Sequence, residues 1–113
     1  MLLQEDPRRK ILLESVDEGL LTLGESGMKA MYFHIQSVTS VKREDIPDNL
    51  EALQTGLEKI FGEGAKMIET AIVKSLCRKL GAQPQEGKER GFVEKINDAL
   101  EYLVTGDSSG ASP

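Results

Sequence analysis

Two stretches of the sequence carry residue types that could cradle a phosphate group. LGESGMKAMY, residues 23–32, and FGEGAKMIET, residues 61–70, each place two glycines, a glutamate and a lysine where a helix is expected to begin. A phosphate loop of the Walker type needs a lysine directly after its last glycine, then a serine or threonine, and a strand before it. Neither stretch meets these requirements. Glu25 and Glu63 also lie where a phosphate would sit, so we interpret both stretches as hinges between helices.

The sequence contains one histidine, His34, and one cysteine, Cys77. A zinc site needs further nitrogen or sulfur ligands. A nucleophile pair needs an orienting partner and an oxyanion hole, and no motif supplies either. A thiol on an apolar helix face behaves as a small buried hydrophobe. We therefore predict no catalytic, cofactor-binding or metal-binding residues and expect that the chain is not an enzyme. The third hypothesis is a thiol or histidine enzyme that uses Cys77 and His34, with Tyr32 as a further candidate.

One basic cluster stands out in an otherwise acidic chain. It comprises Lys74, Arg78 and Lys79 on an expected helix, with Lys88 and Arg90 in the segment that follows. Like charges four residues apart, such as Lys74 and Arg78, are mildly unfavourable in an isolated helix, which hints at an acidic partner. Cations at the end of a helix also suit the helix dipole, and this is the simpler interpretation.

Apolar residues recur at helical spacing in successive segments, and no segment has a convincing strand pattern, so the predicted fold class is all-α. The segments are about residues 7–23, 28–38, 50–61, 65–80 and 92–103. Gly24, Gly62 and Gly81 each follow the last apolar residue of a segment and would end a helix in the left-handed conformation. We predict a compact bundle of about five helices: two tandem helical hairpins plus a C-terminal helix, with connectors at 39–49 and 82–91.

The expected helix at 28–38 is apolar on most of its circumference. Met28, Met31, Ile35 and Val38 form one stripe, and Phe33 lies about 160° around the helix from the centre of this stripe. We therefore expect this helix to be the central one, and Phe33 to be covered either within the chain or by a second subunit. The expected core residues of the other helices are Leu13, Val16, Leu20, Leu23, Leu50, Leu53, Leu57, Ile60, Phe61, Ala65, Ile68, Ala71, Ile72, Leu76, Leu80, Phe92, Ile96, Ala99, Leu100 and Leu103.

Length and composition place the chain among small soluble globular domains. With 113 residues and 39% hydrophobic residues, one helical domain at 1–104 and a flexible polar tail at 105–113 are expected. A single cysteine and a first segment without an apolar core favour a cytoplasmic location. The apolar runs are too short to cross a bilayer. The net charge of −5 argues against broad attraction to nucleic acid or to anionic lipid.

The segments LGESGMKAMYFHIQ, KREDIP and LEALQTGLEKIFGEGAKMIETAIVKSLCRKLG, within residues 11–81, together resemble a small archaeal family, the Nitrosopumilus output domain family, type five. This family was formerly catalogued as a domain of unknown function and has no established activity, cofactor or catalytic residues. The resemblance implies a binding or signalling output role. It also implies a stand-alone protein, or one that meets its sensor in trans.

These observations lead us to expect a protein–protein interaction or signalling output module that self-associates as a homodimer or binds another protein. The candidate interaction surface comprises Tyr32, Phe33, Lys74 and Arg78. The alternative is a nucleic-acid-binding module that uses the basic end of the helix at 65–80. The scarcity of aromatic residues and the acidic balance make nucleic acid the less favoured partner.

Overall fold

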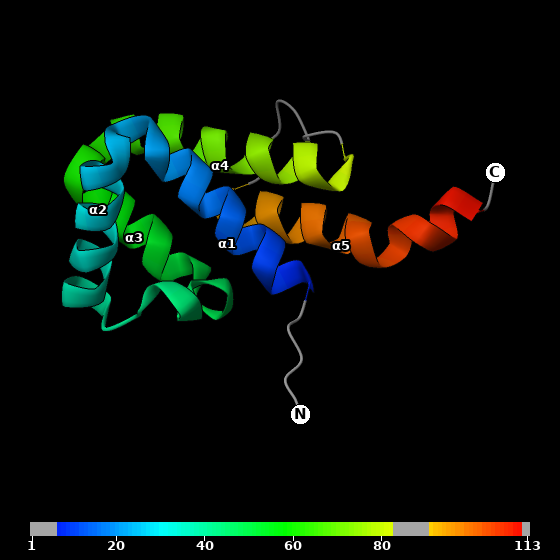
Figure 1. The fold of residues 1–113 in the computed structure, drawn as a ribbon, viewed down its shortest axis with the longest axis horizontal. Helices are drawn as coiled ribbons and strands as arrows, with labels where there is room; N and C mark the ends of the chain where they lie inside the picture. Colours follow the sequence, from blue (N-terminus) through cyan, green and yellow to red (C-terminus); the bar gives the residue numbers. More distant parts are fainter. Residues whose placement is uncertain (1–6, 83–90, 112–113) are drawn as a thin grey trace.

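The fold is entirely helical in the residues that the computed structural model describes, which are 7–82 and 91–111. Side chains are described for 7–82 and 91–101. The elements are α1 (Pro7–Leu20), η1 (Leu21–Leu23), α2 (Gly24–Thr39), η2 (Arg43–Asp48), α3 (Leu50–Phe61), η3 (Gly62–Gly64), α4 (Ala65–Leu80) and α5 (Phe92–Ala111), where η marks a 3₁₀ helix. The all-α prediction is confirmed, and α5 continues past its expected end near residue 103 (Figure 1).

Three glycines change the direction of the chain, as the hinge interpretation requires. Gly24, Gly62 and Gly81 have φ angles of 86°, 56° and 72°, which residues with a Cβ rarely adopt. No atom lies within 4 Å of a Cβ built on any of the three, so backbone conformation rather than space requires glycine there. The predicted helix ends at Gly62 and Gly81 are confirmed, whereas α1 ends at Leu20 and the 3₁₀ turn η1 leads to Gly24. Of the three glycines, only Gly81 has the predicted left-handed helical conformation.

The helices do not pair as two tandem hairpins. The main partner of α1 is α4, to which it runs antiparallel, while α2 packs on α3, and α5 packs on α4 (Figure 1). A short connector predicts that consecutive helices are neighbours. Here, however, η1 and Gly24 turn the chain, so α2 leaves the end of α1 and contacts it only slightly.

The central helix is α4, and the expectation that α2 would be central is wrong. Eight residues of α4 are buried, against only Met31 and Ile35 on α2. Val38 of the predicted α2 stripe is 42% exposed, and Ile60 at the end of α3 is 47% exposed. Both lie near a helix end, beyond the crossing that buries the middle of the stripe. Apolar periodicity therefore overestimates the buried face of α2.

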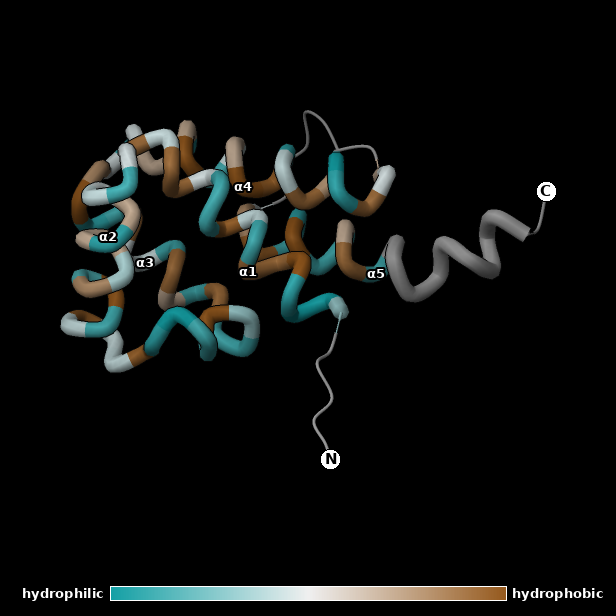
Figure 2. Tube along the Cα trace, viewed as in Figure 1, coloured by the Kyte–Doolittle hydropathy of each residue, from teal (hydrophilic) through white to brown (hydrophobic). Residues whose placement is uncertain are grey.

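The core is otherwise built from the predicted apolar stripes, which turn inward along the helices (Figure 2). Leu12, Ile46 and Val73 are buried and are not among the core residues expected from the sequence. Ile46 lies in η2, so part of the expected connector at 39–49 contributes to the core. The predicted core residues that are buried are Val16, Leu20, Met31, Ile35, Leu50, Leu53, Leu57, Ala65, Ile68, Ile72, Leu76, Phe92, Ile96 and Ala99.

Two glycines inside helices allow close helix crossings. A Cβ on Gly19 of α1 would clash with Cγ1 of Ile72 on α4 and would lie 3.1 Å from the backbone nitrogen of Ile72. A Cβ on Gly56 of α3 would lie 2.5 Å from Cγ1 of Ile35 on α2. Ser15, one turn before Gly19, is fully buried, and its hydroxyl donates to the carbonyl of Ile11 at 2.9 Å. Small residues thus line the side of α1 that approaches α4.

We expect Gly19→Ala to lower the free energy of unfolding by about 1–3 kcal/mol, because the new methyl group meets backbone atoms of Ile72 that cannot move independently. Urea denaturation of both proteins measures this change. Gly64→Ala is the matched control, since Gly64 has a φ of −65° and the nearest neighbour of the new Cβ would be Cβ of Phe61 at 3.7 Å. A loss of stability for Gly64→Ala equal to that for Gly19→Ala would contradict this account.

Candidate functional site

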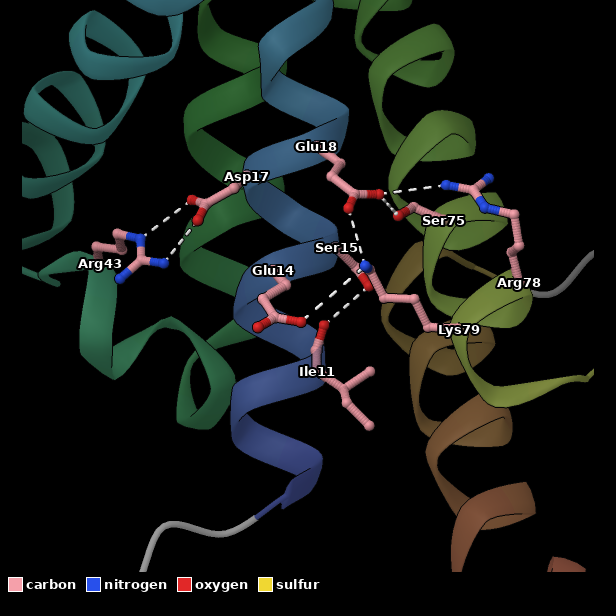
Figure 3. Close-up of polar contacts among 9 residues, drawn as sticks. All are labelled: Ile11, Glu14, Ser15, Asp17, Glu18, Arg43, Ser75, Arg78 and Lys79. Carbon is pink, nitrogen blue, oxygen red and sulfur yellow. Dashed lines mark hydrogen bonds and ion pairs between the residues drawn. The ribbon is translucent and has the colours of Figure 1, made fainter.

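The residues of the predicted interaction surface lie on two different helices. Tyr32 and Phe33 are on α2, whereas Lys74 and Arg78 are on α4. Figure 3 shows Arg43, which stacks over the ring of Tyr32, and Arg78 on opposite sides of α1. The structure therefore does not join the four residues into one continuous surface.

Tyr32 belongs to a polar cluster that ties three elements together. Its hydroxyl donates to Oδ1 of Asp17 on α1 at 2.5 Å. Arg43 of η2 donates to both oxygens of Asp17, at 3.0 and 2.6 Å, and its guanidinium lies 5.8 Å from the centre of the Tyr32 ring. Burial, and then the hydrogen bond to Asp17, raises the pKa of Tyr32. This side chain holds the fold together and is poorly placed to meet a partner.

Phe33, in contrast, points away from the core. Its side chain is 74% exposed, so no other helix among the described residues covers it. Ser26, Ala30 and Ser37 are also exposed and follow the same line along α2 as Phe33, at spacings of four, three and four residues. We call these four residues the outer face of α2. None of these four residues is charged, and the exposed Lys29 borders the face, four residues before Phe33.

A second polar cluster joins α1 to α4 around the carboxylate of Glu18. Ser75 donates to it at 2.5 Å, and Lys79 and Arg78 lie 2.8 and 3.2 Å from its oxygens (Figure 3). Lys79 also lies 4.0 Å from Glu14. The hydrogen bond from Lys79, followed by that from Ser75, lowers the pKa of Glu18. Much of the positive charge at the end of α4 is therefore already matched within the chain, and Lys88 and Arg90 of the predicted basic cluster lie outside the described residues.

Glu69 on α4 is a buried carboxylate that the sequence analysis missed. The charges of Glu58 on α3, Lys66 on α4 and Lys95 on α5 act on its carboxylate, and Oε2 is buried without a hydrogen bond within the described part of the chain. Burial, and then the charge of Glu58, raises its pKa. The signal was present in the sequence, because Glu69 lies three residues before Ile72 and so falls within the apolar stripe of α4.

His34 and Cys77 do not form a reactive pair. His34 is half-buried, and its Nε2 is buried without a hydrogen-bond partner among the described residues. Cys77 is buried, and burial raises the pKa of its thiol. No hydrogen bond links them in the described structure. Across residues 7–82 and 91–101, three or more side chains that could bind a metal do not come together at any point.

The pH dependence of stability is expected to change in opposite directions when Glu18 and Glu69 are replaced. The lowered pKa of Glu18 means that its ionised form stabilises the fold above about pH 4.5, and this contribution is lost in acid. The raised pKa of Glu69 means that ionisation opposes folding, and this cost appears as the pH rises through its folded-state pKa. At pH 7, Glu18→Gln should therefore lower the melting temperature, and Glu69→Gln should raise it.

Thermal melts of the three proteins at pH 7 and pH 3.5 measure these effects, and both differences should shrink at the lower pH. The Glu18 effect should be small, about 0.2–1 kcal/mol, because its ion pairs are partly exposed. A lower melting temperature for Glu69→Gln at pH 7 would show that the ionised carboxylate has a stabilising partner after all.

The Cys77 thiol should react slowly in the native protein. A buried thiol with a raised pKa has little thiolate at neutral pH and little access to reagent. We expect alkylation by iodoacetamide at pH 7.5 to be at least tenfold slower than in the same protein unfolded in urea. A native rate equal to or above the unfolded rate would mean that the thiol is activated, and would reopen the interpretation as a thiol enzyme.

Across the described residues, no helix combines the length and apolar character needed to cross a membrane. Comparison of the chain with protein-family models, with characterised proteins and with solved structures finds no match in any of the three. Membership of the archaeal output domain family therefore stays a prediction from the sequence. The function has to be argued from the surfaces of this chain itself.

Proposed function

We propose that this chain is a small protein–protein interaction module that self-associates through the outer face of α2. The observation that carries the proposal is Phe33, an aromatic side chain that is 74% exposed among small uncharged residues of α2. Burying a phenylalanine side chain contributes roughly 1.5–3 kcal/mol. Contact along Ser26, Ala30 and Ser37 strips no ion of water, and the long side chain of Lys29 beside Phe33 can keep its ammonium group in solvent.

The residues around Phe33 suit contact with another helix. Ala30 and Ser37 lie one turn to either side of it, and their small side chains would let a second helix approach closely. In a symmetric dimer the same face serves both copies, so each Phe33 would pack beside the small residues of the other α2. A 16-residue helix is about 24 Å long and offers less than the roughly 800 Å² per partner of a typical stable interface. The association is therefore expected to be weak and dependent on concentration.

Three further expectations belong to the same proposal. The signalling output role and archaeal origin rest on the family resemblance alone. A cytoplasmic location is supported by the single cysteine, which is buried and unpaired. No catalytic role is assigned to His34 or Cys77, because one is half-buried and the thiol of the other is deprotonated only with difficulty.

The alternative, a nucleic-acid-binding module, receives less support. Lys79 pairs with Glu18, and Arg78 does so in part, which places a carboxylate where a phosphate would have to approach. The chain also carries a net charge of −5, which opposes contact with a polyanion over any large area.

Phe33→Asp should abolish self-association without unfolding the protein. The substitution places a charge where the second copy would be desolvated, but it removes no contact from the core of the subunit, because Phe33 is exposed. Sedimentation velocity from micromolar to millimolar concentration measures association, and circular dichroism measures helix content and melting temperature. We expect wild type to shift toward dimer as concentration rises and Phe33→Asp to stay monomeric with an unchanged melting temperature.

Met67→Asp is the matched control, because Met67 is equally exposed, at 77%, but lies on α4. It should self-associate as wild type does. The proposal fails if wild type is monomeric throughout the concentration range. It also fails if Met67→Asp weakens association as much as Phe33→Asp does, because the apolar contact would then not be specific to α2.

A further inference from the structure

The exposed side of α4 carries positive charge that the described part of the chain only partly neutralises. Lys66, Thr70, Lys74 and Arg78 follow one another at intervals of four residues and are all exposed. Residues four apart on a helix form a continuous row on its surface. We call this row the basic ridge. It contains three cations and no acid, and the one acidic residue of α4, Glu69, is buried.

The cations of the ridge differ in how they are paired. In the part of the chain that the structure describes, neither Lys66 nor Lys74 lies within ion-pair distance of a carboxylate, and the charge of Lys66 acts on the buried carboxylate of Glu69. Arg78 lies 3.2 Å from Glu18, yet 68% of its side chain is exposed, so part of the guanidinium can still bind a second acceptor. Lys74 and Arg78 repel each other mildly as like charges four residues apart, and an acidic ligand would remove this cost.

An exposed apolar side chain adjoins the ridge. Met67 follows Lys66 directly, lies seven residues before Lys74, and is 77% exposed. Residues seven apart lie on nearly the same side of a helix, so Met67 and Lys74 share the exposed face of α4. Methionine is flexible and polarizable, and it suits contact with apolar groups of varied shape. The face therefore combines cations with an apolar contact point.

We propose that the basic ridge and Met67 form a docking surface for an acidic segment of another protein, separate from the outer face of α2. Charge complementarity identifies the occupant as a segment rich in aspartate or glutamate with at least one apolar side chain. The helical rise places the levels of Lys66 and Lys74 about 12 Å apart and those of Lys74 and Arg78 about 6 Å apart. An acidic helix with carboxylates repeated every four residues matches this spacing.

The observations favour an acidic protein segment over nucleic acid. A duplex carries a charge every 1.7 Å or so along its axis and gains little from contact with an exposed methionine. It would also bring a denser negative charge toward Glu18, beside Arg78, than a peptide with one carboxylate per turn does. In a peptide helix, carboxylates four residues apart are separated by about 6 Å along the axis, and an apolar side chain can lie between them. A peptide can therefore contact Met67 and pair with the few cations of the ridge, whereas a duplex matches neither feature.

The probe for this surface is a fluorescein-labelled 20-residue helical peptide with glutamate at every fourth position and leucine on the adjoining line. Its counterpart has glutamine in place of glutamate, and a labelled 20-base-pair DNA duplex serves as the nucleic-acid arm. Fluorescence anisotropy with the full chain at 50 and 200 mM salt measures binding. We expect the acidic peptide to bind with an affinity that falls as salt rises, and the glutamine peptide and the duplex to bind at least tenfold more weakly.

Two charge-reversal variants of equal net charge decide where the peptide binds. The double variant Lys66→Glu with Lys74→Glu should lose at least tenfold in affinity. The matched control reverses Lys29 on α2 and Lys59 on α3, both exposed, and should lose less than threefold. Met67→Ser should weaken binding of the acidic peptide severalfold, and Phe33→Asp should leave it unchanged, since that residue lies on α2. Circular dichroism verifies that each variant keeps the helix content of wild type.

Three results would overturn the proposal. The first is an acidic peptide that does not bind wild type at 50 mM salt. The second is an equal loss of affinity in the two double variants, which would mean that only net charge matters. The third is a duplex that binds more tightly than the peptide and depends on Lys66 and Lys74, which would assign the ridge to nucleic acid instead. None of these results bears on whether Phe33 mediates self-association, so the two proposals fail separately.

Discussion

The close crossing of α1 and α4 is the constraint on which the other features of this structure depend. Gly19 leaves room for Ile72 to approach the backbone of α1, and Ser15 is buried without penalty because its hydroxyl donates to the carbonyl of Ile11. At this short separation the carboxylate of Glu18 reaches Ser75 and Lys79 across the interface. A larger residue at position 19 would separate the helices and break both the apolar contact and the polar contacts beside it.

The same crossing determines which surfaces remain free. Because α4 is covered by α1, α3 and α5, only one side of it faces solvent, and that side is the basic ridge. Asp17 and Glu18 are adjacent in sequence but turn to opposite sides of α1, where Asp17 ties η2 and α2, and Glu18 ties α4 (Figure 3). The acidic residues of α1 are therefore used for ties between helices. The outer face of α2 has no such tie, and this leaves Phe33 exposed.

Features of the fold that depend on residues close together in the sequence could be predicted, and features that depend on contacts between distant segments could not. Glycine at a positive φ and the apolar period of each helix are local, so the helix ends at Gly62 and Gly81 and most core positions were predicted correctly. Periodicity identifies the face of a helix that is buried but not the helix that covers it. For that reason the pairing of α1 with α4 was missed, although Gly19 inside an apolar pattern was a signal for a close crossing. Tyr32 was placed on the interaction surface because nothing local reveals that Asp17, fifteen residues earlier, accepts its hydroxyl.

The two free faces differ in chemistry, and this difference separates their roles. The four residues of the outer face of α2 carry no charge, whereas each copy of the chain carries a net charge of −5, so two copies repel each other as they approach. Added salt screens this repulsion and favours contact through Phe33, while it weakens any contact that relies on Lys66 and Lys74. A single change in ionic strength thus moves the two interactions in opposite directions. A surface that only packs within the subunit would show no effect of salt on self-association or on ligand binding, because its contacts are already made in the monomer.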